Sequence, residues 1–181
     1  MDDICKELKI SKKTLYQYIT NKTDLVNKVL KYMVENVYYK YTVTNHGQNA
    51  IDQLLYISQK VCNSMQHFNP SVTFDLQKYY ADLFRWYIQA SKEIHYTKVM
   101  ANMQQGISEG LFRDDLDVSL VSRIYVRKLE AILDSEFLKS EDFSFEKIFN
   151  VMFDNHIRGI SNAHGIAYYE GIKEQGILPK E

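Results

Sequence analysis

The spacing of apolar residues constrains the fold of this chain more than any other feature. Beyond Lys22 apolar residues recur at helical intervals, and only two prolines, Pro70 and Pro179, occur among the 181 residues. The alternation of apolar and polar residues that is typical of half-buried strands is absent. The pattern predicts an all-helical protein. A hydrophobic content of 45% supplies enough apolar side chains for a core.

The N-terminus contains the signals of a short helix and a turn. Within Met1 to Leu8, Ile4 and Leu8 are four residues apart, and the acidic pair after Met1 favours a helix N-terminus. Lys9 and the two residues after it form the predicted turn. Ile10 is its apolar residue, so we expect Ile10 to pack between this helix and the next.

A second helix and the start of a third follow directly. Ser11 stands at an N-cap position, where its hydroxyl can accept from the backbone N–H of Lys13 or Thr14. Asn21 is a second cap candidate, and Asp24 occupies the acidic position of a capping box. The sequence therefore predicts a helix from Ser11 to Ile19 and another that begins at Lys22.

The second helix has two distinct faces. Leu15 and Ile19, four residues apart, can pack inward. The side chains left to point outward are cationic, hydroxylated or aromatic, without a carboxylate, which suits a phosphate-lined groove. They are Lys12, Lys13, Thr14, Tyr16, Gln17 and Tyr18.

The string D-D-I-C-K-E-L-K-I-S-K-K-T-L-Y-Q-Y-I-T-N-K-T-D-L, from Asp2 to Leu25, resembles the DNA-binding motif of TetR-family (tetracycline-repressor-like) transcriptional regulators. The spacing S-x-x-T-L-Y-x-Y-[FI]-x-x-K-x-x-L is more specific than a generic helix-turn-helix pattern. The resemblance implies an N-terminal helix-turn-helix head with a connecting helix, residues 1–43. It also implies a helical domain, residues 44–181, that binds a small molecule and forms a homodimer.

The resemblance also implies which residues contact DNA. Tyr16 and Lys22 would hold the sugar-phosphate backbone. The residues that would face base edges or nearby phosphates are Lys12, Lys13, Thr14, Gln17 and Tyr18, and Ser11 stands at the start of the same helix.

Members of the family normally carry one more helix before this motif, and the chain begins where the second helix should begin. Two expectations follow from the resemblance. Either the true start lies upstream of Met1, or the connecting helix holds the head loosely and DNA binding is weak.

The charge is unevenly distributed. Residues 1–31 contain seven lysines and four acidic residues, a net charge of +3, whereas the remaining 150 residues carry −4. A basic head suits a DNA groove. A solvated helical face with a chance excess of lysine fits the charge equally well, and the motif decides between them.

Several helix boundaries can be predicted in the rest of the chain. The connecting helix runs from Lys22 into residues 38–41, and a break follows at residues 44–48. A helix over residues 51–65 comes next. Later boundaries are a start at Asn69 and Pro70, a junction near residues 80–83, a stop at Gly110 and a cap at Asp117.

Two apolar helices, Val118 to Phe137 and Ser144 to His164, are candidates for the dimer interface. An internal core is the commoner place for such stripes. The resemblance favours the interface, since these helices would pair with their copies in a four-helix arrangement. The residues concerned are Val121, Ile124, Tyr125, Leu129, Phe149, Met152, Phe153, Ile157 and Ile160.

Aromatic residues make up 13% of the chain, and many lie on helices that surround the effector cavity in the family. Tyrosine combines an apolar wall with a polar tip, which suits an aromatic or amphipathic molecule. Ordinary core or surface tyrosines are the alternative. The candidate ligand residues are Tyr56, Tyr79, Tyr80, Phe84, Trp86, Tyr87, Met100 and Met103.

No motif indicates catalysis, a metal or a cofactor. The five histidines form no i, i+3 or i, i+4 pair, and neither a phosphate-binding glycine loop nor a nucleophile elbow occurs. Cys5 and Cys62 are two isolated thiols without the spacing of metal ligands, which is typical of proteins in a reducing compartment. An enzyme built on Cys62 or His156 is a minor alternative, and the absence of a signal peptide or apolar span favours a cytoplasmic protein.

These features together predict a ligand-responsive DNA-binding transcriptional regulator, most simply a repressor. It would bind a palindromic double-stranded operator as a homodimer, with a small hydrophobic or aromatic effector. The alternative is a helical dimer that binds a small molecule or a protein partner, its DNA binding lost or weakened with the first helix.

Overall fold

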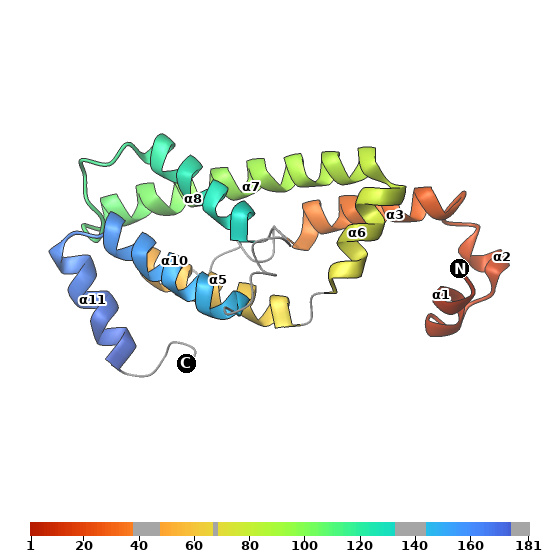
Figure 1. The fold of residues 1–181 in the computed structure, drawn as a ribbon, viewed down its shortest axis with the longest axis horizontal. Coiled ribbons are helices and arrows are strands. Elements are labelled where there is room, and N and C mark those ends of the chain that lie inside the picture. The colour runs from red at the N-terminus through yellow and green to blue at the C-terminus, as the bar shows by residue number, and fades with distance from the viewer. Residues whose placement is uncertain (38–47, 67–68, 133–143, 175–181) are drawn as a thin grey trace. The chain divides into compact units, whose positions relative to one another are not determined.

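The structure is a computed structural model that describes residues 1–37, 48–66, 69–132 and 144–174 (Figure 1). Within these ranges the regular elements are helices, and the single exception is an isolated bridge between Phe112 and Ser161. The all-helical prediction is therefore confirmed for the described residues. The predicted boundary between residues 43 and 44 lies outside them.

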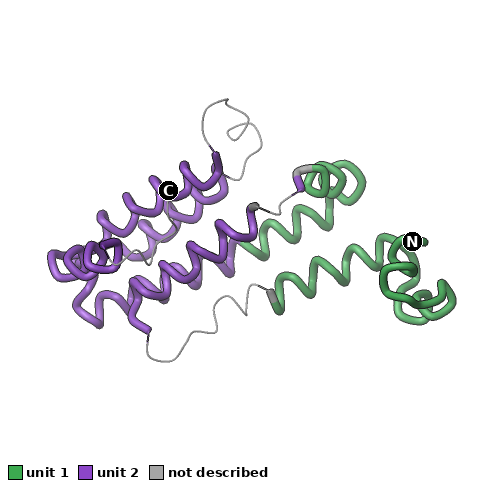
Figure 2. Tube along the Cα trace, turned by 90° about the horizontal axis from the view of Figure 1, so that it is seen from below, with its two compact units in different colours: residues 1–40, 71–91 green, residues 41–70, 92–181 purple. Residues whose placement is uncertain are grey.

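The chain divides into two compact units (Figure 2). The first comprises residues 1–40 and 71–91, and the second comprises residues 41–70 and 92–181. The first unit begins with α1 (Asp2–Glu7), α2 (Lys12–Leu15) and α3 (Lys22–Tyr32), followed by the π-helical turn η1 (Met33–Val37). It also holds most of α6 (Pro70–Tyr79) and the first part of α7 (Ala81–Ser108).

The second unit is built on α5 (Ala50–Gln66), the rest of α7, α8 (Val118–Ile132), α10 (Phe145–Ile160) and α11 (Ala163–Glu174). α10 packs against both α5 and α8 (Figure 1). The core of this unit combines residues of all five helices and of the segment after α7. Its buried members include Ile51, Leu54, Cys62, Met103, Phe112, Ile132, Phe149, Phe153, Ile157 and Tyr169.

Most of the predicted helix boundaries that fall on described residues are confirmed, whereas the ends predicted at residues 38–41 and at Phe137 lie outside them. Pro70 occupies the first position of α6, and Tyr80 separates α6 from α7. Gly110 adopts a left-handed conformation with φ of 68°, which glycine tolerates better than other residues. Asp117 and Ser144 each accept a hydrogen bond from the backbone N–H three residues on, at 2.9 and 3.3 Å.

The predicted helix from Ser144 to His164 is wrong in its last turn. α10 ends at Ile160, Ser161 is extended with φ of −79° and ψ of 146°, and α11 then begins at Ala163. The carboxamide of Asn162 accepts from the backbone N–H of Gly165 at 3.0 Å, which caps α11. Ser161 and Asn162 therefore separate two helices where the apolar spacing indicates one.

The break exists because residues 160–162 pair with residues 111–113, a contact we call the seam. The backbone N–H of Arg113 donates to the carbonyl of Ile160 at 2.9 Å, and that of Asn162 donates to the carbonyl of Leu111 at 3.1 Å. The Asn162 side chain also donates to the carbonyl of Gly110 at 2.9 Å. These bonds replace those that a continuous helix would make.

Gly165 permits the seam to close. A Cβ atom added at Gly165 would overlap the carbonyl oxygen of Leu111, which belongs to the backbone of the seam. At Gly171 in the same helix, by contrast, an added Cβ meets no atom of the described chain within 4 Å. The two glycines of α11 thus form a matched pair for a stability test.

We expect Gly165→Ala to lower the free energy of unfolding by about 1–3 kcal/mol, because the seam must open to admit the methyl group. Gly171→Ala should be neutral or stabilising by about 0.5–1 kcal/mol, since alanine restricts the unfolded chain. Urea denaturation followed by circular dichroism measures both. Equal stabilities of the two variants would contradict the close contact at Gly165.

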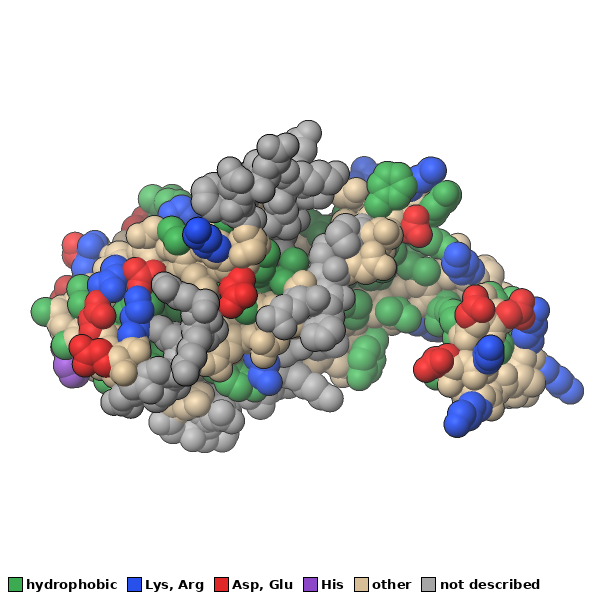
Figure 3. Space-filling model, turned by 60° about the horizontal axis from the view of Figure 1, so that its bottom comes forward, with side chains coloured by type: hydrophobic (Ala, Val, Ile, Leu, Met, Phe, Trp, Pro, Cys, Tyr) green, Lys and Arg blue, Asp and Glu red, His purple; other side chains and the backbone are tan. Residues whose placement is uncertain are grey.

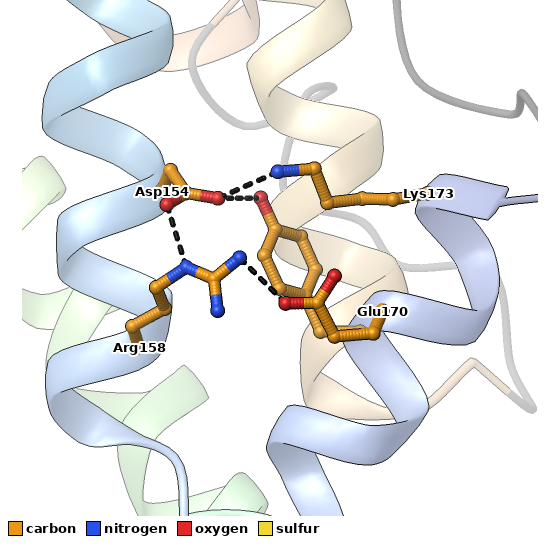
Figure 4. A network of polar contacts seen from close by, with 5 residues as sticks. Asp154, Arg158, Glu170 and Lys173 are labelled. Carbon is orange, nitrogen blue, oxygen red and sulfur yellow. Dashed lines mark hydrogen bonds and ion pairs between the residues drawn. The ribbon is translucent and has the colours of Figure 1, made fainter.

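Asp154 links α10 to α11 through a polar network (Figure 4). Its carboxylate accepts hydrogen bonds from Arg158 at 2.7 Å, from Lys173 at 2.8 Å and from the buried hydroxyl of Tyr169 at 3.0 Å. Arg158 extends the network to Glu170 at 2.6 Å. Partial burial raises the pKa of Asp154, but the hydrogen bonds from Arg158, Lys173 and Tyr169 outweigh it and lower the pKa to about 2.

This pKa makes part of the stability dependent on pH. Because the folded-state pKa of Asp154 lies below its unfolded value of about 3.9, the contribution is present above pH 4 and is lost as pH falls toward 2. With allowance for solvent screening it amounts to about 1 kcal/mol. We therefore expect Asp154→Asn to be less stable than the unmodified chain at pH 7, with the gap closing near pH 2.

Denaturation midpoints between pH 7 and pH 2 measure this gap. Asp114→Asn, at an exposed acidic residue in the segment between α7 and α8, is the control for a general loss of negative charge. A gap for Asp154→Asn that stays constant across the range would show that its carboxylate does not gain from these donors.

Candidate nucleic-acid interface

The segment from Ser11 to Tyr18, called here the 11–18 segment, begins at a side-chain cap. The Ser11 hydroxyl accepts from the backbone N–H of Thr14 at 3.0 Å, so Thr14 rather than Lys13 is the donor. α2 itself is a single turn. The chain continues in turns to Tyr18, whose backbone N–H donates to the carbonyl of Leu15 at 3.0 Å, so the helix is shorter than the predicted span to Ile19.

The inward side of this segment is fixed by a small apolar core. Leu15 and Ile19 are each 5% exposed and pack with Cys5 of α1. The predicted inward pair is therefore buried, and Ile10 packs on the same core as expected. Met1, Ile4, Ile10 and Leu25 surround it. This core holds α1, the 11–18 segment and the start of α3 together.

The turn between α1 and α2 contains Lys9 in a left-handed conformation, with φ of 54°. The backbone N–H of Ile10 donates to the carbonyl of Cys5 at 3.0 Å, which closes the turn. A lysine costs roughly 1 kcal/mol in this conformation, since its Cβ crowds the following carbonyl. The turn is therefore held by its hydrogen bonds and by the packing of Ile10.

The junction with α3 is fixed by reciprocal capping. Asn21 accepts from the backbone N–H of Asp24 at 2.9 Å, and the Asp24 carboxylate accepts from that of Thr20 at 2.9 Å. Lys28 donates to Asp24 at 2.9 Å and to the carbonyl of Tyr18 at 2.6 Å. The bond from Thr20, and then that from Lys28, lowers the pKa of Asp24. This arrangement attaches the end of the 11–18 segment to α3.

The predicted DNA-contact residues lie on the outside of this head, from which lysine side chains project (Figure 3). The rings of Tyr16 and Tyr18 are 48% and 71% exposed. Thr14 is half-buried beneath the cap. The other predicted residues are exposed: Ser11, Lys12, Lys13, Gln17 and Lys22.

One carboxylate joins this cationic edge, which the sequence did not reveal. Asp2 of α1 forms an ion pair with Lys12 at 2.5 Å, and both side chains are largely exposed. Their hydrogen bond lowers the pKa of Asp2 and raises that of Lys12. An exposed ion pair contributes little to stability, so Lys12 can exchange Asp2 for another anion at small cost.

The predicted ligand residues fall in both compact units. Tyr79, Tyr80, Phe84, Trp86 and Tyr87 belong to the first unit, and Tyr56, Met100 and Met103 belong to the second. Met103 is fully buried in the core of its unit. Tyr56 lines a cavity between α5 and α11. The eight predicted ligand residues therefore do not form one site within a single unit.

The predicted interface residues are divided between the core and the surface. Tyr125, Phe149, Phe153, Ile157 and Ile160 are buried within the chain, and Val121, Leu129 and Met152 pack partly against its core. Ile124 is 46% exposed. Leu120 and Val151, which the prediction did not include, are also exposed on α8 and α10. The dimer stays a prediction, and these three exposed apolar residues are available to a partner.

The surroundings of Cys62 and His156 favour the neutral form of each side chain. Burial, with a smaller effect of Glu146, raises the pKa of the Cys62 thiol. His156 stacks on Tyr125 with ring centroids 3.7 Å apart, and burial, with Lys128, lowers its pKa to about 4. Burial also raises the pKa of Tyr125 well above its ordinary value.

Within the part of the chain that the structure describes, no cluster of three or more histidine, cysteine, aspartate or glutamate residues is arranged to hold a metal ion. No helix in the same ranges combines the length and the apolarity needed to cross a membrane.

Comparison with models of protein families, with curated proteins and with solved structures finds no match to this chain.

The capping arrangement at the junction with α3 can be tested without DNA. Asn21→Ala removes the acceptor of the Asp24 N–H and should cost about 1 kcal/mol. We expect hydrogen exchange of the Thr20 and Asp24 amides to accelerate about fivefold, provided that the head opens locally. Thr23→Ala, at an exposed residue in the same turn, is the control. Similar amide protection in both variants would contradict the role of the Asn21 cap.

Proposed function

We propose that this chain is a DNA-binding transcriptional regulator, a repressor that binds a palindromic operator as a homodimer and is released by a small hydrophobic or aromatic molecule. The proposal depends chiefly on the outward face of the 11–18 segment. That face presents Lys12, Lys13, Tyr16, Gln17 and Tyr18 while Leu15 is buried behind it.

The chemistry of this face suits a nucleic acid. Exposed lysines and tyrosine hydroxyls can bind phosphate oxygens, which supply most of the affinity without reading the sequence. The Gln17 carboxamide has a donor and an acceptor in one plane, and this geometry can pair with an adenine edge in the major groove. Gln17 is exposed, as such a contact requires.

The local structure supports the same proposal. Leu15, Ile19 and the Asn21 cap hold the segment from behind and at its end. Residues 1–31 carry a net charge of +3, which favours association with a polyanion. A rigidly held cationic surface loses less side-chain and backbone entropy on binding than a loose one.

Dimerisation would determine the spacing and symmetry of the DNA sites that the chain binds. Two heads related by a two-fold axis would contact half-sites about 34–36 Å apart, so a palindromic operator follows from symmetry. Exposed Ile124 on α8 and Val151 on α10 are available to a second copy. An effector that favours a different separation of the heads would weaken DNA binding, and DNA would weaken effector binding by the same factor.

The contact assignment makes distinct predictions for two residues of the head. Lys22→Ala should weaken binding to all DNA sequences and reduce the salt dependence by about one ion, because one phosphate contact is lost. Gln17→Ala should cost about 1–3 kcal/mol on the preferred sequence and relax the preference at particular positions. Selection from a random duplex library, followed by gel shifts at several salt concentrations, measures both effects.

Lys60→Ala, at an exposed lysine of α5, is the control for the loss of one positive charge. If Lys22→Ala and Gln17→Ala bind like this control, the contact assignment is wrong. If the full chain selects no sequence and binds DNA without salt dependence, the proposal itself fails, and a dimer that binds other partners is favoured.

A further inference from the structure

A cavity of about 480 Å³ lies between α5 and α11, entirely within the second unit. Its volume is in the range of small-molecule sites, about 300–1,000 Å³. Its lining combines an apolar wall with a few polar groups. The lining residues are Gln48, Asp52, Leu55, Tyr56, Gln59, Ala167, Tyr168, Gly171 and Ile172.

The charge of this lining has one sign. Asp52 is its acidic residue, and the described residues that line the cavity include no lysine or arginine. Lys60 lies beside the lining, with its ammonium 5.3 Å from the centroid of the Tyr56 ring. Lys60 is exposed, so it can leave this ring for water at little cost.

Asp52 is held in place but retains binding capacity. It lies in the first turn of α5, and its carboxylate accepts the Tyr168 hydroxyl at 3.0 and 3.1 Å from its two oxygens. An ionised carboxylate offers about four lone-pair directions, and one hydroxyl does not exhaust them. The tyrosine therefore orients the carboxylate and leaves it able to accept from a ligand.

The electrostatic surroundings of Tyr168 agree with a negative site. Burial is the largest cause that raises the pKa of its hydroxyl, and the carboxylates of Asp52 and Glu109 raise it further. A hydrogen bond from Asn49 acts in the opposite direction. Two acidic groups thus act on this side of the cavity, where they favour a positive charge.

The cavity also has free space on the α11 side. A Cβ atom added at Gly171 meets no described atom within 4 Å, although Gly171 belongs to the lining. Leu55 and Ile172 supply apolar surface from the two helices. A ligand with an apolar body can therefore lie along this wall while its polar end reaches Asp52.

We propose that this cavity binds an organic cation, a protonated or quaternary amine carried on an apolar body. The Asp52 carboxylate is its counter-ion, and the rings of Tyr56 and Tyr168 stabilise the same charge through their faces. Leu55 and Ile172 cover the apolar body. The inference rests on the proposed function in that it names the chemical class of the effector.

The test uses three probes with one skeleton, 4-phenylbutylamine, 4-phenylbutanol and 4-phenylbutanoate, which are positive, neutral and negative at pH 7. Ligand-observed NMR with the full chain measures their affinities in the absence of DNA. The ammonium should bind about tenfold more tightly than the alcohol, and the carboxylate should bind most weakly. Equal affinities, or no binding by the amine, would overturn the inference.

Two variants separate charge from space. Asp52→Asn keeps an acceptor for Tyr168, and it should reduce the preference for the amine over the alcohol to about one. Gly171→Leu should fill the cavity and abolish binding of the amine and the alcohol, with the helical circular dichroism unchanged. Asp114→Asn is the charge-matched control and should behave like the unmodified chain. A preference that survives Asp52→Asn would overturn the role of Asp52.

DNA binding is measured by gel shift, separately from the affinities of the three probes. Amine binding that weakens the gel shift supports both proposals. Amine binding to a chain that does not bind DNA supports this site and contradicts the proposed function, whereas DNA binding by a chain that ignores all three probes does the reverse. The two failures are therefore distinguishable.

Discussion

The second unit depends on the seam, where residues 111–113 pair with residues 160–162. These backbone bonds end the segment after α7 and turn the chain from α10 into α11. This turn places α11 so that the Tyr168 hydroxyl can donate to Asp52, although the two residues are 116 positions apart in the sequence. Phe112, buried at the same place, joins the seam to the core. The cavity between α5 and α11 therefore exists because two loop segments supply each other's backbone partners.

Local signals in the sequence were sufficient where a residue acts on its own neighbours. Ser11, Asn21, Asp117 and Ser144 cap the helices they precede, and each bond spans three residues. The break at Ser161 has one local signal of this kind, the Asn162 cap, but it was missed because no proline marks the break and the pairing partner Phe112 lies far away in the sequence. Apolar spacing continues across the break, so α10 and α11 resemble one helix.

The same distinction applies to the candidate sites. Helical spacing correctly separated the buried Leu15 and Ile19 from the exposed residues of the 11–18 segment. It could not reveal the pair of Asp2 with Lys12, since that contact depends on how α1 lies against α2. Helical spacing could not reveal the cavity between α5 and α11 either. Of the aromatic residues chosen for a ligand, Tyr56 lines the cavity, whereas Asp52 acquires its role from a tyrosine on another helix.

In the proposed function, the pair of Asp2 with Lys12 would affect the binding of DNA of any sequence. A phosphate that approaches Lys12 must compete with a carboxylate of the chain itself, and this competition is the same for every DNA sequence. Discrimination between sequences comes from base contacts and is left unchanged. For the proposed regulator, the internal carboxylate would therefore weaken binding to every DNA sequence slightly and by the same factor, and the preference for an operator would stay unchanged.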